Sequence, residues 1–77
     1  MAFGPATLSA AVGDTIVWID RDIVPHTATE DRAGGWEVGP VLGGDSAALV
    51  VRTAGTVRYF CRFHPEMRGT LEVRPQR

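Results

Sequence analysis

The chain has 77 residues and a mass of 8.3 kDa, which leaves room for one small domain and excludes a separate catalytic domain. Its net charge of −1 and pI near 6.0 argue against nucleic acid or a membrane surface as a partner. All eight basic residues are arginine, so lysine-based chemistry is excluded, and the single cysteine excludes an internal disulfide. No apolar run is long enough for a membrane span, and we expect no signal peptide in these residues.

Nine glycines and five prolines interrupt the chain so often that a helix of ordinary length does not fit. Between them lie six short segments rich in β-branched and aromatic residues, which we predict as strands: residues 6–12, 15–19, 26–29, 47–52, 56–61 and 70–74. The fourth could also form one turn of helix capped by Ser46, but its two adjacent valines favour a strand. Short strands separated by turns indicate an all-β sandwich or barrel, which we expect to be a single domain over residues 1–77.

Turn residues predict how these strands connect. Gly13 and Asp14 separate the first two strands, and residues 54–55 open the fifth. Residues 67–69, Met-Arg-Gly, are predicted to close a hairpin into the sixth strand. Residues 31–45 contain six glycines or prolines and are predicted to form one long loop.

The residues with the most distinctive chemistry gather near the C-terminus. Cys61, His64 and Met67 form a C-x2-H-x2-M array where a predicted strand ends, and His26 begins a strand that a sandwich could bring beside it. Two imidazoles, one thiolate and a distant thioether are the ligands of a blue-copper site. Both Cu(I) and Cu(II) accept these ligands, so the ion can gain or lose an electron without a large change in its ligands or geometry.

Simpler roles for these residues compete with a copper site. Taken singly, the cysteine would be a small buried hydrophobe, each histidine a surface or core residue, and the methionine a gap filler. Together they use every Cys and His of the chain at metal-ligand spacing, which favours the site. A zinc site is disfavoured, because a thioether is a poor fourth ligand for Zn²⁺. A Cys-His nucleophile would leave Met67 without a role and needs a cleft that so small a chain is not expected to form.

At these residues the sequence resembles the cupredoxins, and within them the amicyanin and plastocyanin-like branch. The resemblance spans nearly the whole chain and is carried by residues 3–5 (Phe-Gly-Pro), 13–20 (Gly-Asp-Thr-Ile-Val-Trp-Ile-Asp), 25–26 (Pro-His), 55–61 (Gly-Thr-Val-Arg-Tyr-Phe-Cys), 64–65 (His-Pro) and 67 (Met). It implies a small Greek-key β-sandwich holding one copper ion that cycles between Cu(II) and Cu(I). It also implies that His26, Cys61 and His64 are the strong ligands and Met67 the weak axial one.

Three features depart from the family pattern. Thr27 stands where an asparagine commonly ties the two ligand loops together, so Pro25 and Thr27 are the candidate residues just outside the ligand set. Arg62 and Phe63 stand where Thr and Pro are usual. Family members usually have a further strand before the Phe-x-Pro element, so we expect a fold without that first N-terminal strand, whose bare sheet edge could pair with a second copy.

The resemblance also implies a function. A one-electron carrier of this kind meets its redox partner proteins transiently, through an apolar rim around the second histidine ligand. The rim here is expected to comprise Pro25, Val41, Leu42, Phe63 and Pro65, flanked by Arg62 and Arg68 as docking charges for an acidic partner. The family is extracytoplasmic, which predicts a periplasmic or other extracytoplasmic location.

Two other classes of function remain open at this point. A copper-binding module that stores, delivers or senses the metal would use the same ligands without shuttling electrons, although the chain has no Met-rich or His-rich tail. An enzyme is disfavoured, because copper oxidases and nitrite reductases need additional histidine ligands and both histidines here are already assigned.

Overall fold

The computed structural model describes residues 2–76 and places seven strands and no helix in that part of the chain. They are β1 (Thr7–Ala11), β2 (Thr15–Ile19), β3 (His26–Glu30), β4 (Glu37–Val41), β5 (Ser46–Val50), β6 (Gly55–Cys61) and β7 (His64–Arg74). The six predicted strands are all present, and the fourth, β5, is a strand rather than a helical turn. No helix capable of spanning a membrane was found within residues 2–76.

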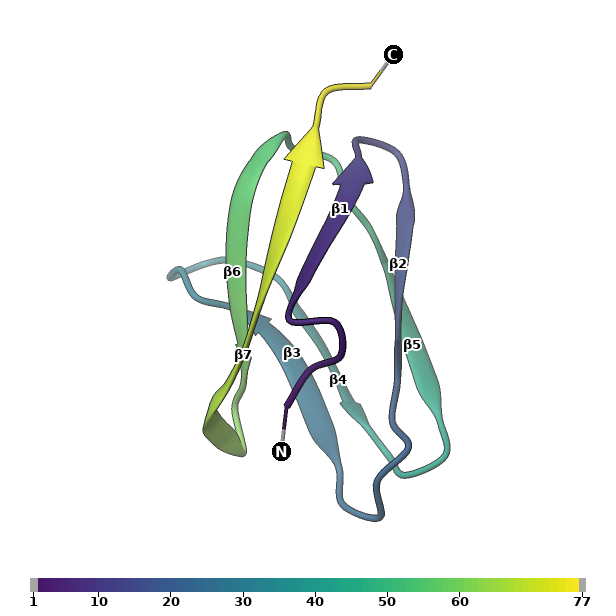
Figure 1. Ribbon diagram of the computed structural model, residues 1–77. Coiled ribbons are helices and arrows are strands. Elements are labelled where there is room, and N and C mark those ends of the chain that lie inside the picture. Colours follow the sequence, from purple (N-terminus) through teal and green to yellow (C-terminus); the bar gives the residue numbers. More distant parts are fainter. Residues whose placement is uncertain (1, 77) are drawn as a thin grey trace.

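The strands form two sheets that face each other (Figure 1). The larger sheet has the order β1-β7-β6-β3-β4, and the smaller pairs β2 with β5 antiparallel. The chain therefore crosses between the sheets after β1, β2, β4 and β5. Such crossings produce a sandwich, which confirms the predicted fold class.

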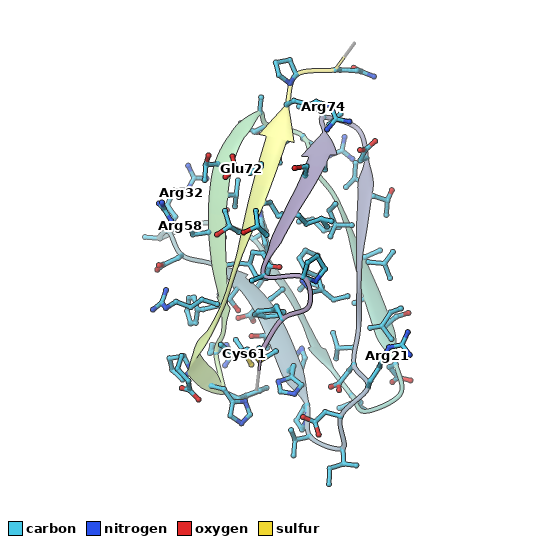
Figure 2. All side chains as sticks on the ribbon, in the orientation of Figure 1. Arg21, Arg32, Arg58, Cys61, Glu72 and Arg74 are labelled. Carbon is cyan, nitrogen blue, oxygen red and sulfur yellow. The ribbon has the colours of Figure 1, made fainter. Side chains whose placement is uncertain are left out.

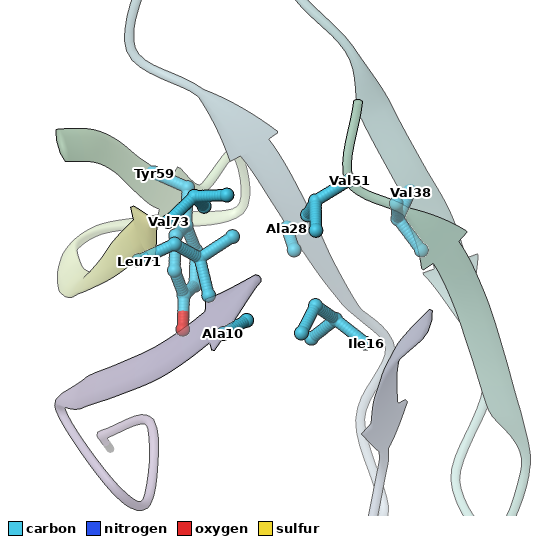
Figure 3. Close-up of a cluster of buried hydrophobic side chains, with 8 residues drawn as sticks. All are labelled: Ala10, Ile16, Ala28, Val38, Val51, Tyr59, Leu71 and Val73. Carbon is cyan, nitrogen blue, oxygen red and sulfur yellow. The ribbon is translucent and has the colours of Figure 1, made fainter. Parts of the chain in front are cut away.

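The space between the sheets is filled by alternate residues of both (Figure 3). Leu71 and Val73 of β7 are 1% and 5% exposed, and they pack in one cluster with Ile16 of β2 and Ala28 of β3. This period of two is expected when one face of a strand is buried and the other is solvated. The cluster is small, so each of its larger side chains carries a large share of the stability.

Aromatic rings extend this core. The Tyr59 ring lies 4.8 Å from Phe3, 5.5 Å from Trp18 and 6.0 Å from Trp36, measured between ring centroids. The edge-on and tilted orientations of these rings are those that aromatic pairs prefer. Trp36 is thus packed against the core, although it comes from a segment predicted to be a loop.

That loop prediction was wrong for residues 37–41, which form β4. Gly39 and Pro40 suggested irregular structure, because proline donates no hydrogen bond to a sheet. The structure accommodates Pro40 because β4 is the last strand of its sheet, and Gly39 adopts a φ of 102° that other residues rarely reach. Residues 31–36 and 42–45 remain connecting segments, as predicted.

The predicted turn at residues 67–69 was also wrong. The β6–β7 hairpin turns at Arg62 and Phe63, and β7 already begins at His64. Gly69 lies inside β7 opposite Tyr59, and a Cβ atom there would overlap the Tyr59 ring. This glycine allows close packing of an aromatic ring, a role that a sequence pattern cannot distinguish from a turn.

Candidate metal centre

One end of the sandwich collects the three strongest candidate ligands. Cys61 ends β6, His64 begins β7 after a two-residue turn, and His26 begins β3 on the neighbouring strand. Figure 2 shows Cys61 at the end of the molecule remote from the C-terminus, beside the β6–β7 turn. A register shift between Phe60 and Cys61 breaks the regular ladder at this point, as bulges do next to functional sites.

The donor atoms of these residues are arranged as one ion would require. Cys61 Sγ lies 3.6 Å from His26 Nδ1 and 3.8 Å from His64 Nδ1, and all three donors lie within 4.8 Å of one another. Ligand bonds of about 2.0 Å to nitrogen and about 2.3 Å to sulfur give a separation of about 3.7 Å around one ion in a plane. The sequence prediction that these three residues meet is therefore confirmed, and they suit a metal that accepts two imidazoles and a thiolate.

Asp22 orients His26. His26 Nε2 lies 3.3 Å from Asp22 Oδ2, so the Nε2–H donates to this carboxylate. Nδ1, which is hydrogen-bonded to Cys61 Sγ in the metal-free chain, is the nitrogen that a metal would take. Burial lowers the pKa of His26, but its hydrogen bonds to Cys61 and Asp22 outweigh burial and raise it above the usual value. The Asp22 contact was not found from the sequence, because residue spacing in an irregular loop carries no signal of it.

Thr27 ties the two ligand-bearing segments together. Its backbone N–H donates to Cys61 Sγ at 3.4 Å, and its side-chain Oγ1 accepts the backbone N–H of Arg62 at 2.8 Å. Thr27 is 1% exposed, so both bonds are shielded from water. A threonine thus links the two segments at the position where the resemblance leads us to expect an asparagine.

These bonds continue into a closed ring. Thr27 Oγ1 lies 3.0 Å from Thr29 Oγ1, and Thr29 donates its hydroxyl to Glu37 Oε1 at 2.9 Å. Because the single hydroxyl hydrogen of Thr29 is donated to Glu37, the Thr27 hydroxyl is the donor in its hydrogen bond with Thr29. Arg62 closes the ring with its Nε 2.8 Å and its Nη2 3.2 Å from the two carboxylate oxygens of Glu37. Backbone and side chain of Arg62 are thereby both held, which fixes the turn between Cys61 and His64.

The thiol of Cys61 is acidic in this environment. Burial by itself raises its pKa, but hydrogen bonds from the backbone N–H groups of Thr27 and Phe63 and from the rings of His26 and His64 outweigh it and lower the pKa to about 6. The thiolate is the form that binds metals. The fold therefore prepares the ligand near neutral pH.

This acidity predicts a pH dependence of the metal-free chain. Thiolate absorbance in the ultraviolet should rise with a midpoint near pH 6 in the folded chain, against about 8.5 after unfolding in urea. Since the pKa is lowered on folding, the thiolate's contribution to the free energy of unfolding is complete above about pH 8.5 and is lost as the pH falls to about 6. Cys61→Ser should lack the absorbance change, and a folded-state midpoint near 8.5 would contradict the environment described.

The remaining candidate residues are placed as follows. Met67 is buried at 6% exposed on β7, and it lines a groove together with His26. Pro25, Leu42, Phe63 and Pro65 are exposed and can form an apolar rim. Val41 cannot, because it lies opposite His26 in the β3–β4 register and is only 5% exposed. The rim prediction is therefore corrected at this residue.

Both predicted docking charges have partners inside the chain. Arg62 pairs with Glu37, and Arg68 Nη1 lies 3.0 Å from Asp31 Oδ2. The Arg62 guanidinium lowers the pKa of Glu37, as does the Thr29 hydroxyl. Paired in this way, the two arginines give the rim little excess positive charge.

Comparison with known proteins agrees with this geometry. No family model matches the chain. Amicyanin from Paracoccus denitrificans is 35% identical over an alignment of 77 positions. The alignment covers 95% of this chain and 59% of the relative. Plastocyanin from Scenedesmus fuscus is 28% identical over an alignment of 85 positions, which covers 95% of this chain and 87% of the relative. The chain thus spans less than two thirds of the length of that amicyanin.

The fold comparison gives the same result. A solved structure of an oxidised amicyanin variant superposes with a TM-score of 0.84 at 31% identity, covering 95% of this chain and 73% of that one. Similarity of this extent in both sequence and fold establishes kinship. The chain belongs to the cupredoxin family, among its amicyanin- and plastocyanin-like members.

Proposed function

We propose that this chain is a mononuclear blue-copper protein that carries single electrons between redox partner proteins, and that it is not an enzyme. The observation that supports the proposal most directly is the convergence of His26, Cys61 and His64 donors within 4.8 Å. Copper bound there would supply a one-electron couple between Cu(II) and Cu(I). Met67 is proposed as the weak axial ligand.

The surrounding residues hold the donors in place. Asp22 fixes the His26 ring, and Thr27 joins the turn that follows Cys61 to the strand that begins at His26. Ligands held in this way need not rearrange when the charge of the ion changes, which is what rapid electron exchange requires. The half-buried His64 and the exposed Phe63 and Pro65 are the proposed contact for a transient partner.

A copper storage, delivery or sensing module is the second candidate, since it would use the same ligands. Two measurements on the copper-loaded chain separate the functions. A carrier should give a reversible voltammetric wave and should keep its metal in both oxidation states during dialysis against a Cu(I) chelator. Release of Cu(I) to the chelator within minutes, or an irreversible wave, would favour delivery.

Met67→Gln tests the axial ligand. An amide oxygen binds Cu(II) more strongly than a thioether does, so the variant should keep a copper-thiolate absorption but show a lower reduction potential. Met67→Leu, which removes the donor and keeps an apolar side chain, should shift the potential the other way. Voltammetry of the three proteins in one buffer checks both shifts, and an unchanged potential in both variants would show that Met67 is not a ligand.

We also propose a periplasmic or other extracytoplasmic location, on the strength of the family. Cell fractionation followed by immunodetection tests this, and recovery of the protein with cytoplasmic markers would refute it.

A further inference from the structure

Thr29 and Glu37 lie outside the candidate ligand set and are linked to it through Thr27. They face each other in the register of β3 and β4, and Thr29 Oγ1 donates to Glu37 Oε1 at 2.9 Å. Thr29 Oγ1 also lies 3.0 Å from Oγ1 of Thr27, whose backbone N–H donates to Cys61 Sγ at 3.4 Å. The Glu37 carboxylate is thus connected by two hydroxyl groups to the residue that contacts the sulfur.

The carboxylate sets the direction of these hydrogen bonds. A hydroxyl group has one hydrogen and rotates about its C–O bond, so Thr27 by itself does not fix where its lone pairs point. An ionised carboxylate only accepts, so the hydrogen of Thr29 goes to Glu37 and the hydrogen of Thr27 goes to Thr29. The lone pairs of Thr27 Oγ1 are then free for the backbone N–H of Arg62, which donates to it at 2.8 Å. A chain of hydrogen bonds that ends on an anion also polarises each acceptor along it, which strengthens this last bond.

Glu37 also holds the side chains of the β6–β7 turn. Its carboxylate accepts Arg62 Nε at 2.8 Å and Nη2 at 3.2 Å, the two-point geometry of a strong arginine–carboxylate pair. The guanidinium oriented in this way lies over the Phe63 ring, 5.3 Å from the ring centroid. Arg62 and Phe63 make up the whole turn between the two strands. Both of its residues are therefore held by contacts that lead back to Glu37.

The same turn supplies a hydrogen bond to the candidate ligand. The backbone N–H of Phe63 donates to the sulfur of Cys61, as the backbone N–H of Thr27 does. Hydrogen bonds around the cysteine sulfur tune the reduction potential of a blue-copper centre. They withdraw electron density from the thiolate, which stabilises Cu(I) relative to Cu(II) and raises the potential. The position of the turn therefore bears on the potential of a bound copper ion.

We propose that Thr29 and Glu37 are positioning residues of the metal centre, which hold the β6–β7 turn against Thr27 and thereby keep the reduction potential of bound copper high. This inference rests on the proposed blue-copper function. Among the described residues, the hydrogen bonds of Thr29 and Glu37 go to Thr27 and Arg62 and to each other, so their effect reaches the centre through the turn. The ion pair is half-exposed, and exposed pairs add little to global stability. The expected effects are therefore local to the turn and the centre.

Amide hydrogen exchange of the metal-free chain, followed by NMR, tests the hold on the turn without copper. Thr29→Val keeps the charge and nearly the volume of the side chain but removes the hydroxyl that orients Thr27. The Arg62 amide should then exchange about fivefold faster or more, the effect of weakening one hydrogen bond. Thr29→Ser keeps the hydroxyl and should stay within about twofold of the parent rate. Glu37→Ala opens the same ring from β4 and should also speed this exchange.

Redox titration of the copper-loaded proteins tests the effect on the potential. At one solution potential, the ratio of Cu(II) to Cu(I) in Thr29→Val should exceed that of the parent by about threefold or more, and Thr29→Ser should stay near the parent. Thr56→Val is the matched control. The Thr56 hydroxyl also donates to a carboxylate, that of Glu72 at 3.0 Å, but near the end of β6 remote from Cys61. It should change neither the exchange of the Arg62 amide nor the potential, and none of these three variants alters the charge of the chain.

Three results would overturn the proposal. They are an Arg62 amide that exchanges at the parent rate in both Thr29→Val and Glu37→Ala, a coloured copper complex of Thr29→Val with the potential of the parent, and an equal shift of potential in Thr56→Val. A parent chain that forms no coloured copper complex would refute the proposed function and, with it, the role in the potential. Amide exchange would then still decide whether Thr29 and Glu37 hold the turn.

Discussion

Cys61→Ser is expected to abolish the intense visible absorption that Cu(II) produces with the parent chain, and to weaken copper binding by at least about 100-fold. The absorption requires a thiolate bonded to Cu(II), and Cys61 is the only thiol in the chain. A serine hydroxyl is a poor ligand because it stays protonated at neutral pH, whereas the thiol of Cys61 has a pKa of about 6. Titration of the metal-free chain with Cu(II), followed by visible spectroscopy, measures both effects.

Two controls make this result interpretable. Circular dichroism and thermal unfolding should show that Cys61→Ser still folds, since the sulfur is replaced by a smaller polar atom at a fully buried position. Met67→Gln changes a different proposed ligand and should keep a coloured copper-thiolate complex. A colourless complex of the parent, or a serine variant that keeps the colour, would rule out the proposed centre.

Leu71→Ala is expected to lower the free energy of unfolding by about 3–5 kcal/mol. Leu71 is 1% exposed and belongs to the core cluster, beside Tyr59 and Val73, so its truncation removes buried apolar surface and leaves a cavity in the core (Figure 3). A domain of this length has only about 4–12 kcal/mol of total stability. The variant should therefore lose a large share of its stability and unfold at a clearly lower urea concentration. Urea denaturation of the metal-free chain measures the change without a contribution from ligand binding.

Leu42→Ala is the matched control. It makes the same chemical change at a residue that is 58% exposed, and should alter the free energy of unfolding by less than about 0.5 kcal/mol. Equal losses in the two variants would mean that the leucine at residue 71 is not part of a packed core.

The three candidate ligands could be picked out from the sequence because they are chemically rare and regularly spaced. Cysteine and histidine occur three times in 77 residues, so Cys61 and His64 at metal-ligand spacing stand out against the background. Their neighbours could not be predicted in the same way. Asp22, Thr29 and Glu37 are common polar residues. The contacts of Asp22 with His26 and of Thr29 with Thr27 are close in sequence but depend on the local backbone conformation. The contact of Glu37 with Arg62 forms only when β4 and the β6–β7 turn are brought together.

The strands show the same contrast. Segments rich in β-branched residues were located correctly, because alternation of buried and exposed side chains is a local property. Gly39, Pro40 and Gly69 were misleading, because the same residues serve in turns, at sheet edges and beneath aromatic rings. Which role applies depends on the neighbouring strand, and that strand can lie far away in the sequence.

By itself, the sequence determined the all-β class, the absence of a disulfide and the identity of the three strong candidate ligands, because composition and short spacings encode these features. Only the tertiary structure decided how the candidate ligands are held and which rim residues are exposed. These features depend on long-range pairing between the sheets. A hydrogen bond across 35 residues, such as the one from Arg62 to Thr27, leaves no pattern in either local segment.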